Sequence, residues 1–341
     1  MQHELICTQP ATPPNLALRS FELRTPGAGE VLVQVQATSV NPIDVKRASG
    51  YGGRLLGLKG AARFPLVLGN DVAGIVNDIG AGVTRFARGQ RVFGLLGTGR
   101  AGGAHASHVL VSQDLLLPAP DDADPTALAV LPYSFTTMWL AIRATGITAD
   151  NARGTRVLIN GANGGLGRLA MQVLGHWGSE ITAICGKGQH QIGVDLGARV
   201  AVEHGPGCIE SLPSDFDVVL NFANWDDDAL LASRLGARAL GHATTVHPLL
   251  SNFDRLGWLG GAWASRSDRN RVRAVVASRA PKASHAWTIF KPDREALDAL
   301  AEGVRARRLS LPIGIARSFD NATAVFDHVS GGKPGRAVLL A

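Results

Sequence analysis

The sequence predicts an α/β protein of two domains, one dominated by β-strands and the other built as a doubly wound parallel sheet. Residues 1–122 show strand patterns and glycine turns without the spacing of a strand–helix repeat. From Asp121 onward short apolar runs alternate with helical segments, as in parallel βαβ units. A length of 341 residues suits about two domains, each able to bury its own core.

The N-terminal half is expected to be rich in strands. Val31–Ala37 alternates apolar and polar side chains at period two, as a half-buried strand does. Asn41 precedes Pro42, which favours an extended or turn conformation there. The glycine-rich loop that follows, residues 49–53, carries Tyr51. Strand-like runs and glycine turns continue through residues 64–111.

The second half alternates helices and strands. Pro125 suits the first turn of a helix, and residues 134–145 form a second one. Asp293–Arg307 is an amphipathic helix, and a terminal strand, Arg336–Leu340, is expected to return to the strand-rich half. Residues 250–285 show no clear pattern and receive no firm assignment. The predicted domains are therefore 1–122 with 294–341, and 123–293.

The stretch Arg156–Gly178 organises the second domain. An apolar run, Val157–Ile159, is followed by a glycine-rich turn and then by apolar residues at helical spacing. Such a unit binds pyrophosphate, because the glycines allow close backbone approach and the helix N-terminus presents free N–H groups. Ala162 holds the first glycine position of the G-x-G-x-x-G pattern, and Gly164 and Gly167 hold the others. The alternative is an ordinary strand-to-helix turn.

Composition limits the possible functions. The net charge is +6 and the pI about 9.6, and the basic residues are spread along the chain with only small clusters at Arg266–Arg273 and Arg305–Arg308. This distribution favours a solvated basic surface over a nucleic-acid site. Three scattered cysteines without metal-ligand spacing indicate reduced thiols. No apolar run of about 18 residues and no secretory signal are evident, so we expect no membrane contact and a cytoplasmic location.

Several motifs together resemble the zinc-independent medium-chain dehydrogenases/reductases over nearly the whole chain. Within that superfamily the chain is similar to the quinone oxidoreductases, and most similar to the group containing the mitochondrial reticulon-interacting NADPH oxidoreductase. The motifs that carry the resemblance are Asn41–Asp44, Ser49–Gly52, Phe64–Gly74, Leu131–Tyr133, Thr137–Trp139, Gly161–Gly167 and Gly335–Leu339.

The resemblance implies a GroES-like β-rich domain, a Rossmann domain inserted into it, and an active site in the cleft between them. It also implies a homodimer formed through the edge strand His285–Phe290. Asn70 and Asp71 stand where zinc-dependent relatives carry a His-Glu pair, and no cysteine lies between Cys7 and Cys185. We therefore expect no metal.

Three residues are candidates for the catalytic site. The amide of Asn41 could donate a hydrogen bond to a substrate carbonyl, although Asn41 could equally be a turn residue before proline. Tyr51 is a second donor, proton source or ring wall, supported by the resemblance. Asp44 is expected to orient its neighbours, and Asp71 to hold its loop.

The predicted cofactor is NADPH. The second strand of the parallel sheet ends in Gly186 and Lys187 without an acid, and Lys187 would attract a 2′-phosphate unless it is an ordinary solvated lysine. His204 and Gly186 depart from the tyrosine and serine common in similar enzymes. Lys333 and Arg336 could add an anionic contact. The remaining expected cofactor residues are Thr137, Gly161, Ala162, Asn163, Gly164, Gly165, Leu166, Asn221 and Phe222.

These features together predict an NADPH-dependent reductase that transfers hydride to a quinone or to an alkene conjugated with a carbonyl group. A dedicated enoyl or enone reductase of a biosynthetic pathway is the alternative within the enzymes. A non-enzymatic NADPH-binding structural or RNA-binding protein is the alternative outside them.

Overall fold

The computed structural model describes residues 2–97 and 102–341, and the chain divides into two compact units. The first contains Met1–Tyr133 and Lys291–Ala341, and the second contains Ser134–Phe290. The first boundary lies beyond the predicted residue 122 because α3 (Pro125–Leu128) packs on strands of the first unit. Its N-cap Asp124 accepts the N–H of Thr126, as the Pro125 start signal suggested.

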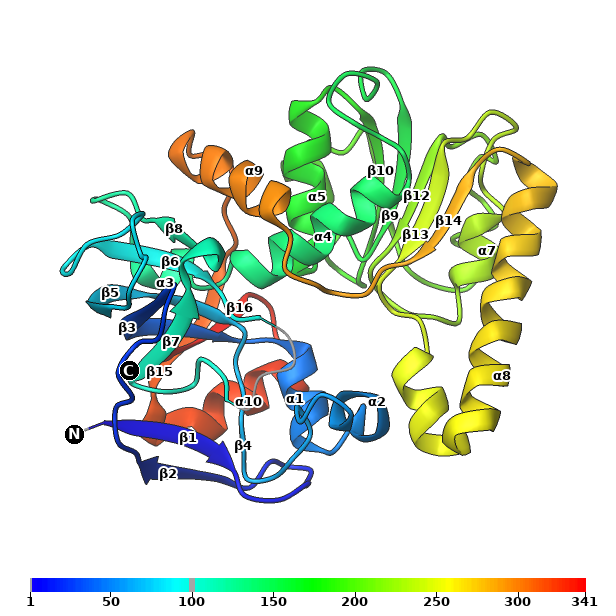
Figure 1. Cartoon of the computed structure of the whole chain (residues 1–341). Coiled ribbons are helices and arrows are strands. Elements are labelled where there is room, and N and C mark those ends of the chain that lie inside the picture. Colours follow the sequence, from blue (N-terminus) through cyan, green and yellow to red (C-terminus); the bar gives the residue numbers. More distant parts are fainter. Residues whose placement is uncertain (1, 98–101) are drawn as a thin grey trace. The chain divides into compact units, whose positions relative to one another are not determined.

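The first unit is built around a seven-stranded sheet in the order β15-β16-β3-β5-β6-β8, with β7 also paired to β3 (Figure 1). β3 and β5 run antiparallel, and β16 pairs with β3 in register Ala337 with Val40, so the end of the chain completes this sheet. The strands are β3 (Glu30–Val40), β5 (Asp71–Ile79), β6 (Arg91–Leu95), β7 (His108–Ser112), β8 (Leu116–Pro118), β15 (Ile313–Ser318) and β16 (Arg336–Leu340).

A small sheet and short helices complete this unit. Three strands, β1 (His3–Cys7), β2 (Leu16–Ser20) and β4 (Leu66–Val67), form a separate antiparallel sheet. One buried apolar cluster, which includes Leu5, Val40 and Phe326, joins it to the longer sheet. The helices are α1 (Pro42–Ala48), α2 (Gly53–Gly57), α9 (Arg294–Arg305) and α10 (Ala322–Ser330), with single turns η1 (Gln113–Leu115) and η2 (Phe319–Asn321).

The second unit is a six-stranded parallel sheet in the order β11-β10-β9-β12-β13-β14. The chain moves outward from β9 to β11 on one side and from β12 to β14 on the other, so the direction reverses between β9 and β12. This confirms the predicted doubly wound sheet, in which ligands bind beyond the carboxyl ends at the switch point. The strands are β9 (Arg156–Asn160), β10 (Glu180–Cys185), β11 (Val200–Glu203), β12 (Val218–Asn221), β13 (Gly241–Thr244) and β14 (Ser284–Trp287).

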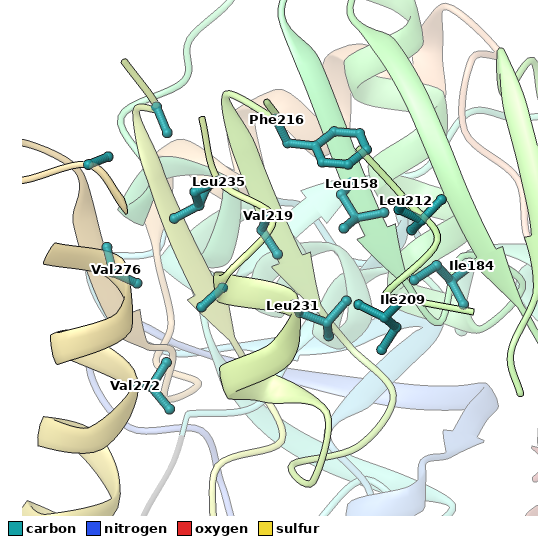
Figure 2. Packing of buried hydrophobic residues seen from close by; sticks show 13 residues of the cluster. Leu158, Ile184, Ile209, Leu212, Phe216, Val219, Leu231, Leu235, Val272 and Val276 are labelled. Atoms are coloured by element: carbon teal, nitrogen blue, oxygen red, sulfur yellow. The ribbon is translucent and has the colours of Figure 1, made fainter. Parts of the chain in front are cut away.

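Apolar side chains pack the helices onto this sheet. Figure 2 shows one buried cluster that contains Leu158, Val219 and Phe216 on the sheet side together with Leu231 of α7 and Val276 of α8. Burying such side chains is worth roughly 1.5–3 kcal/mol each, which fixes the helices on the sheet. The helices are α4 (Pro132–Ala144), which starts two residues before the unit, α5 (Gly165–His176), α6 (His190–Asp195), α7 (Asp228–Ala232) and α8 (Leu249–Arg279).

Two segments differ from the sequence expectations. Residues 249–279, where no structure was assigned, form the long helix α8, broken at Gly257 with φ 72° and ψ −168°. The glycine interrupts the helical period, which hid the helix from the sequence pattern. The segment Pro125–Ala144 is apolar and long enough to cross a membrane, contrary to the expectation, although 67% of it is buried as in a core helix.

Candidate functional site

The glycine turn predicted to bind a pyrophosphate lies directly after β9, where it leads into α5. Gly161 has φ 82°, a left-handed conformation suited to glycine, and Gly164 is the N-cap of α5. A Cβ on Gly167 would lie 2.2 Å from the carbonyl oxygen of Gly161, so only glycine allows this close packing of helix on turn. Ala162 is buried and has no positive φ, which explains why alanine is tolerated at the first glycine position.

The first turn of α5 offers N–H groups to an anion. Gly165 and Leu166 open the helix and are half-buried, while Gly164 is exposed. The first N–H groups of a helix have no partner within it and carry the positive end of its dipole. A turn of this shape at the carboxyl end of the central strand fits a pyrophosphate.

Asn163 joins this turn to the turn after β10. Its Oδ1 accepts the backbone N–H of Gly186 at 2.9 Å, and its Nδ2 donates to Gln189 Oε1. Arg168 Nε in turn donates to the Asn163 carbonyl oxygen at 2.9 Å. Gln189 was not predicted because its contact with Asn163 depends on how β9 and β10 are paired. Arg168 was not predicted because the direction of its side chain, back toward the turn before α5, is not evident from the sequence pattern.

Lys187 lies exposed in the turn after β10, and a carboxylate lies close to it. Glu203 ends β11 and is paired with Cys185 of β10. Its Oε1 accepts the N–H of Gly188 at 2.8 Å and contacts His190 Nδ1 at 3.1 Å. Hydrogen bonding from His190 is the main cause that lowers the pKa of Glu203, and Lys187 adds to it. No acid follows β10 directly in the chain, and Glu203 comes close to Lys187 only because β11 pairs with β10.

His204 follows Glu203 and is exposed, as a residue facing a nucleotide would be. Its Nε2 lies 2.7 Å from Asp227 Oδ2, so an acidic group already contacts the ring. Asn224 Nδ2 donates to the same carboxylate oxygen at 2.8 Å. This arrangement ties the end of β11 to the loop after β12.

Asn221 ends β12 but uses its side chain inside the protein. Its Nδ2 donates to the Asn224 carbonyl at 2.6 Å and to Asp228 Oδ1 at 2.8 Å. Its Oδ1 accepts from Asn160 Nδ2 at 3.1 Å and from the Ala223 N–H at 3.2 Å. With both amide hydrogens engaged, we assign Asn221 to holding its loop and not to a side-chain contact with a cofactor.

Behind Asn221 lies a buried polar chain that the sequence analysis missed. Asp228 Oδ1 lies 3.2 Å from His242 Nε2, and His242 Nδ1 lies 3.0 Å from His285 Nδ1. His242 is the main cause that lowers the pKa of Asp228, and burial lowers the pKa of His285 to about 4. The two histidines face one another because β13 and β14 pair them in register.

Phe222 and Thr137 complete the predicted cofactor residues. Phe222 is half-buried and its N–H donates to the Asn160 carbonyl at 3.0 Å, which continues the pairing of β12 with β9. Thr137 lies in α4 and is nearly buried, with 8% exposed. Every predicted cofactor residue from Thr137 to Phe222 thus belongs to the second unit.

The predicted catalytic residues lie in the first unit, where Asn41 and Asp44 form a helix cap. Asn41 is the N-cap of α1, and its N–H donates to Asp44 Oδ2 at 2.8 Å. Asp44 Oδ1 also accepts the N–H of Gly69 at 3.1 Å. Both residues are buried.

The Asn41 amide is fully engaged with buried partners. Its Nδ2 donates to Ser39 Oγ at 2.9 Å and to Asp71 Oδ2 at 3.0 Å, and its Oδ1 accepts from Arg336 Nη2. The structure therefore favours the turn alternative for Asn41 over direct donation to a substrate. Arg336 is likewise directed inward, unlike the anionic contact expected of it, whereas Lys333 is exposed.

Asp71 is the centre of this buried network. Its Oδ1 accepts the N–H of Tyr133 at 2.6 Å, and its Oδ2 accepts from Ser39 Oγ and from Asn41. Burial raises the pKa of Asp71 to about 6, while these hydrogen bonds and the charge of Arg336 lower it. Burial also lowers the pKa of Arg336.

Tyr51 is half-buried in the turn that joins α1 to α2. Its backbone N–H donates to the Lys46 carbonyl at 3.1 Å, and Lys46 Nζ lies 5.4 Å from the centre of its ring. A cation over the ring stabilises this placement of Tyr51.

Asn70 and Asp71 occupy the positions where zinc-dependent relatives carry metal ligands, and here both form hydrogen bonds. Asn70 Nδ2 donates to Asp44 Oδ1 at 3.4 Å, and Asp71 Oδ1 accepts the N–H of Tyr133. Among residues 2–97 and 102–341, no group of three or more His, Cys, Asp or Glu side chains could hold a metal ion.

Comparisons with known proteins agree with this architecture. Residues 27–121 match the Alcohol dehydrogenase GroES-like domain family. The chain is 32% identical over 333 residues to the mitochondrial NAD(P)H oxidoreductase RTN4IP1 of Homo sapiens, covering 91% of this chain and 81% of that protein. Its Danio rerio counterpart is 31% identical over 320 residues, covering 89% and 81%. The quinone oxidoreductase of Coxiella burnetii has the same fold, with a TM-score of 0.81 over 100% of both chains at 20% identity.

These comparisons confirm the predicted fold class and the predicted family resemblance. They also show that the predicted cytoplasmic location is wrong, since the similar proteins from zebrafish, mouse, human and cattle are named as mitochondrial. The prediction of location failed because targeting segments determine where a protein is located in the cell, and the folded domains do not.

Proposed function

Because this chain belongs to the quinone oxidoreductase family of the medium-chain dehydrogenases/reductases, and is thus a nicotinamide-dependent oxidoreductase, we propose that it uses NADPH to reduce quinones or carbonyl-conjugated alkenes without a metal. The glycine cradle between β9 and α5 carries this proposal, because its left-handed Gly161 and its close-packed Gly167 suit a pyrophosphate. The bound coenzyme would supply hydride.

NADPH is proposed over NADH because Lys187 follows β10 and could attract a 2′-phosphate. Glu203 opposes this attraction in part, but its carboxylate is already engaged by the Gly188 N–H and by His190. Arg168, held against Asn163, adds a second positive charge at the same edge of the sheet. Two cations near one engaged carboxylate leave a net attraction for a phosphate.

The residues of the first unit would serve the acceptor. A substrate carbonyl gains negative charge as hydride arrives, and a neutral donor stabilises that charge. We propose Tyr51 as this donor and, for a quinone or an enol, as the proton source. Asn41, Asp44 and Asp71 would act as positioning residues that hold the turn before α1, since their hydrogen bonds are made to one another.

We also propose a homodimer formed through β14. It is an edge strand, paired only with β13 in the sheet, and its outer backbone groups could pair with a second copy. Size-exclusion chromatography with light scattering would measure the mass directly, and a monomer at micromolar concentration would contradict this assembly.

The decisive assay follows the oxidation of NADPH and of NADH against a benzoquinone, an alkyl enone and an enoyl thioester. We expect quinone and enone turnover with NADPH preferred. Turnover of the enoyl thioester alone would identify a dedicated enoyl reductase instead. Tight NADPH binding without any turnover, combined with salt-sensitive RNA binding, would contradict an enzymatic role.

Tyr51 is tested by Tyr51→Phe, with Tyr133→Phe as the matched control because Tyr133 contributes its backbone N–H to the Asp71 contact. Loss of the Tyr51 hydroxyl should lower kcat about a hundredfold while the KM for NADPH stays unchanged. The control should stay near the wild-type rate. A Tyr51→Phe enzyme with wild-type kcat for every acceptor would remove Tyr51 from the mechanism.

A further inference from the structure

Helix α8 carries most of the excess charge of the chain. It contains six arginines and two aspartates, a net charge of +4, whereas the whole chain has +6. Arg271 pairs with Asp268 at 3.6 Å, and in the described part of the chain Arg266, Arg269 and Arg273 form no ion pair. The helix therefore presents a concentrated positive field outside the proposed coenzyme site.

The same helix exposes large apolar side chains around its break. Leu259 is 90% exposed and Trp263 is 74% exposed, while Leu256 and Trp258 are 51% and 46% exposed. The break at Gly257 turns α8 into a short and a long segment that meet at these residues (Figure 1). We call residues 255–269 the α8 tip. Exposed apolar groups gathered in this way mark an interaction site.

The α8 tip is held rigidly by the helix itself. Asn252 Nδ2 of the short segment donates to Ser265 Oγ at 3.3 Å and to Asp268 Oδ2 at 3.0 Å in the long segment. A Cβ on Gly261 would lie 2.7 Å from the Cα of Phe253, so the two segments are in close contact. The apolar residues are thus presented by a preformed structure.

Apolar and basic residues follow one another along one face of the long segment. Leu259, Trp263, Arg266 and Arg273 recur at helical spacing, and the opposite face places Val272 and Val276 in the core. An element with Trp and Leu at one end and arginines beside them suits a membrane interface, where apolar groups insert and arginines meet headgroups.

A second copy of the chain does not fit this face as well. A twofold contact places the same patch on both partners, so two helices of charge +4 would be brought together. Like charges at such a contact are unfavourable. An anionic lipid surface offers both the apolar layer and the complementary charge.

We propose that the α8 tip docks this protein on anionic phospholipid membranes, with Leu259 and Trp263 inserted at the headgroup boundary and Arg266 and Arg269 bound to lipid phosphates. Such docking takes place at the membrane surface and needs no membrane-spanning helix, but it departs from the expectation of no membrane contact that was drawn from the sequence. It is also independent of the coenzyme chemistry proposed above.

The test uses flotation of the full chain with vesicles of phosphatidylcholine alone or mixed with phosphatidylglycerol. We expect binding to the mixed vesicles only, weakened by salt. Leu259→Ser/Trp263→Ser and Arg266→Glu/Arg269→Glu should each lower the vesicle affinity at least about tenfold. Arg305→Glu/Arg308→Glu, on exposed residues at the end of α9, applies the same charge change elsewhere and should retain the wild-type affinity.

NADPH oxidation by each variant is measured alongside, so failure of the enzymatic proposal is separable from failure of the docking proposal. Absence of binding to mixed vesicles overturns the docking proposal. Equal loss in the α9 control also overturns it, because net charge alone would then explain the binding. A loss of turnover in Leu259→Ser/Trp263→Ser with unchanged vesicle binding overturns it too, and would place these residues against the acceptor.

Discussion

Asp71 accepts the backbone N–H of Tyr133 at 2.6 Å, although 62 residues of chain separate them. Tyr133 is the last residue of the N-terminal part of the first unit, and its N–H is one of the few backbone donors that reach the buried carboxylate. The same carboxylate accepts from Ser39 and Asn41, which come from β3 and from the start of α1. A single buried side chain of β5 thereby connects β3, the start of α1 and Tyr133 within the first unit.

Asp71 should make the stability of the protein depend on pH. Its pKa is raised from 3.8 to about 6 in the fold, so between these values the native state binds more protons than the unfolded state. The free energy of unfolding therefore falls as pH rises from about 4 to about 6, by roughly 3 kcal/mol. Urea unfolding should be measured at several pH values across this range. The free energy of unfolding should depend less on pH in Asp71→Asn than in the wild type, whereas Asp320→Asn, at an exposed position, should keep the wild-type pH dependence.

Arg336→Ala should destabilise the protein strongly. The guanidinium donates to Asn41 Oδ1, and its charge lowers the pKa of Asp71, so its loss leaves buried polar groups less satisfied. We expect a decrease of roughly 3 kcal/mol in the free energy of unfolding. Lys333→Ala, three residues earlier and exposed, should change it by less than about 0.5 kcal/mol. Equal effects of both substitutions would contradict the buried role of Arg336.

Gly167→Ala should disrupt coenzyme binding. The added methyl would lie 2.2 Å from the Gly161 carbonyl, which must then move and distort the cradle. Gly175→Ala in the same helix meets only Ile181 Cδ1 at 4.0 Å and should be neutral or slightly stabilising. Coenzyme titration by fluorescence together with thermal unfolding checks both variants. Wild-type affinity in Gly167→Ala would exclude this turn as the pyrophosphate site.

Lys187→Glu should raise the KM for NADPH by about tenfold or more and leave the KM for NADH nearly unchanged, because the substitution repels a 2′-phosphate. Lys282→Glu, an exposed lysine before β14, provides the matched charge control. Steady-state kinetics with NADPH and with NADH distinguishes recognition of the 2′-phosphate from a general effect of the charge change. A parallel change for NADH would mean that Lys187 does not recognise the phosphate.

Glu203→Gln should lower the KM for NADPH several-fold. Glutamine keeps an acceptor for the Gly188 N–H while removing the negative charge beside Lys187. Glu203→Ala removes the acceptor as well, so it should loosen the turn and raise the KM for both coenzymes. If Gln and Ala behaved alike, anchoring of the turn would not be the function of the carboxylate.

The sequence by itself determined those features whose physics is local. The strand–glycine–helix unit at Arg156–Gly178 and the alternation of later strands and helices follow from short-range periodicity and glycine conformation, so the parallel sheet and its cradle were predictable. Lys187 could be found in the same way, since it directly follows a strand.

Tertiary structure decided what depends on strand pairing and on burial. Glu203 faces the Lys187 turn only because β11 pairs with β10, and Asn41 lost its expected role because Ser39, Asp71 and Arg336 converge on its amide. Helix α8 remained hidden because Gly257 interrupts its period. Buried hydrogen-bond partners are chosen by contacts distant in the chain, which no local pattern encodes.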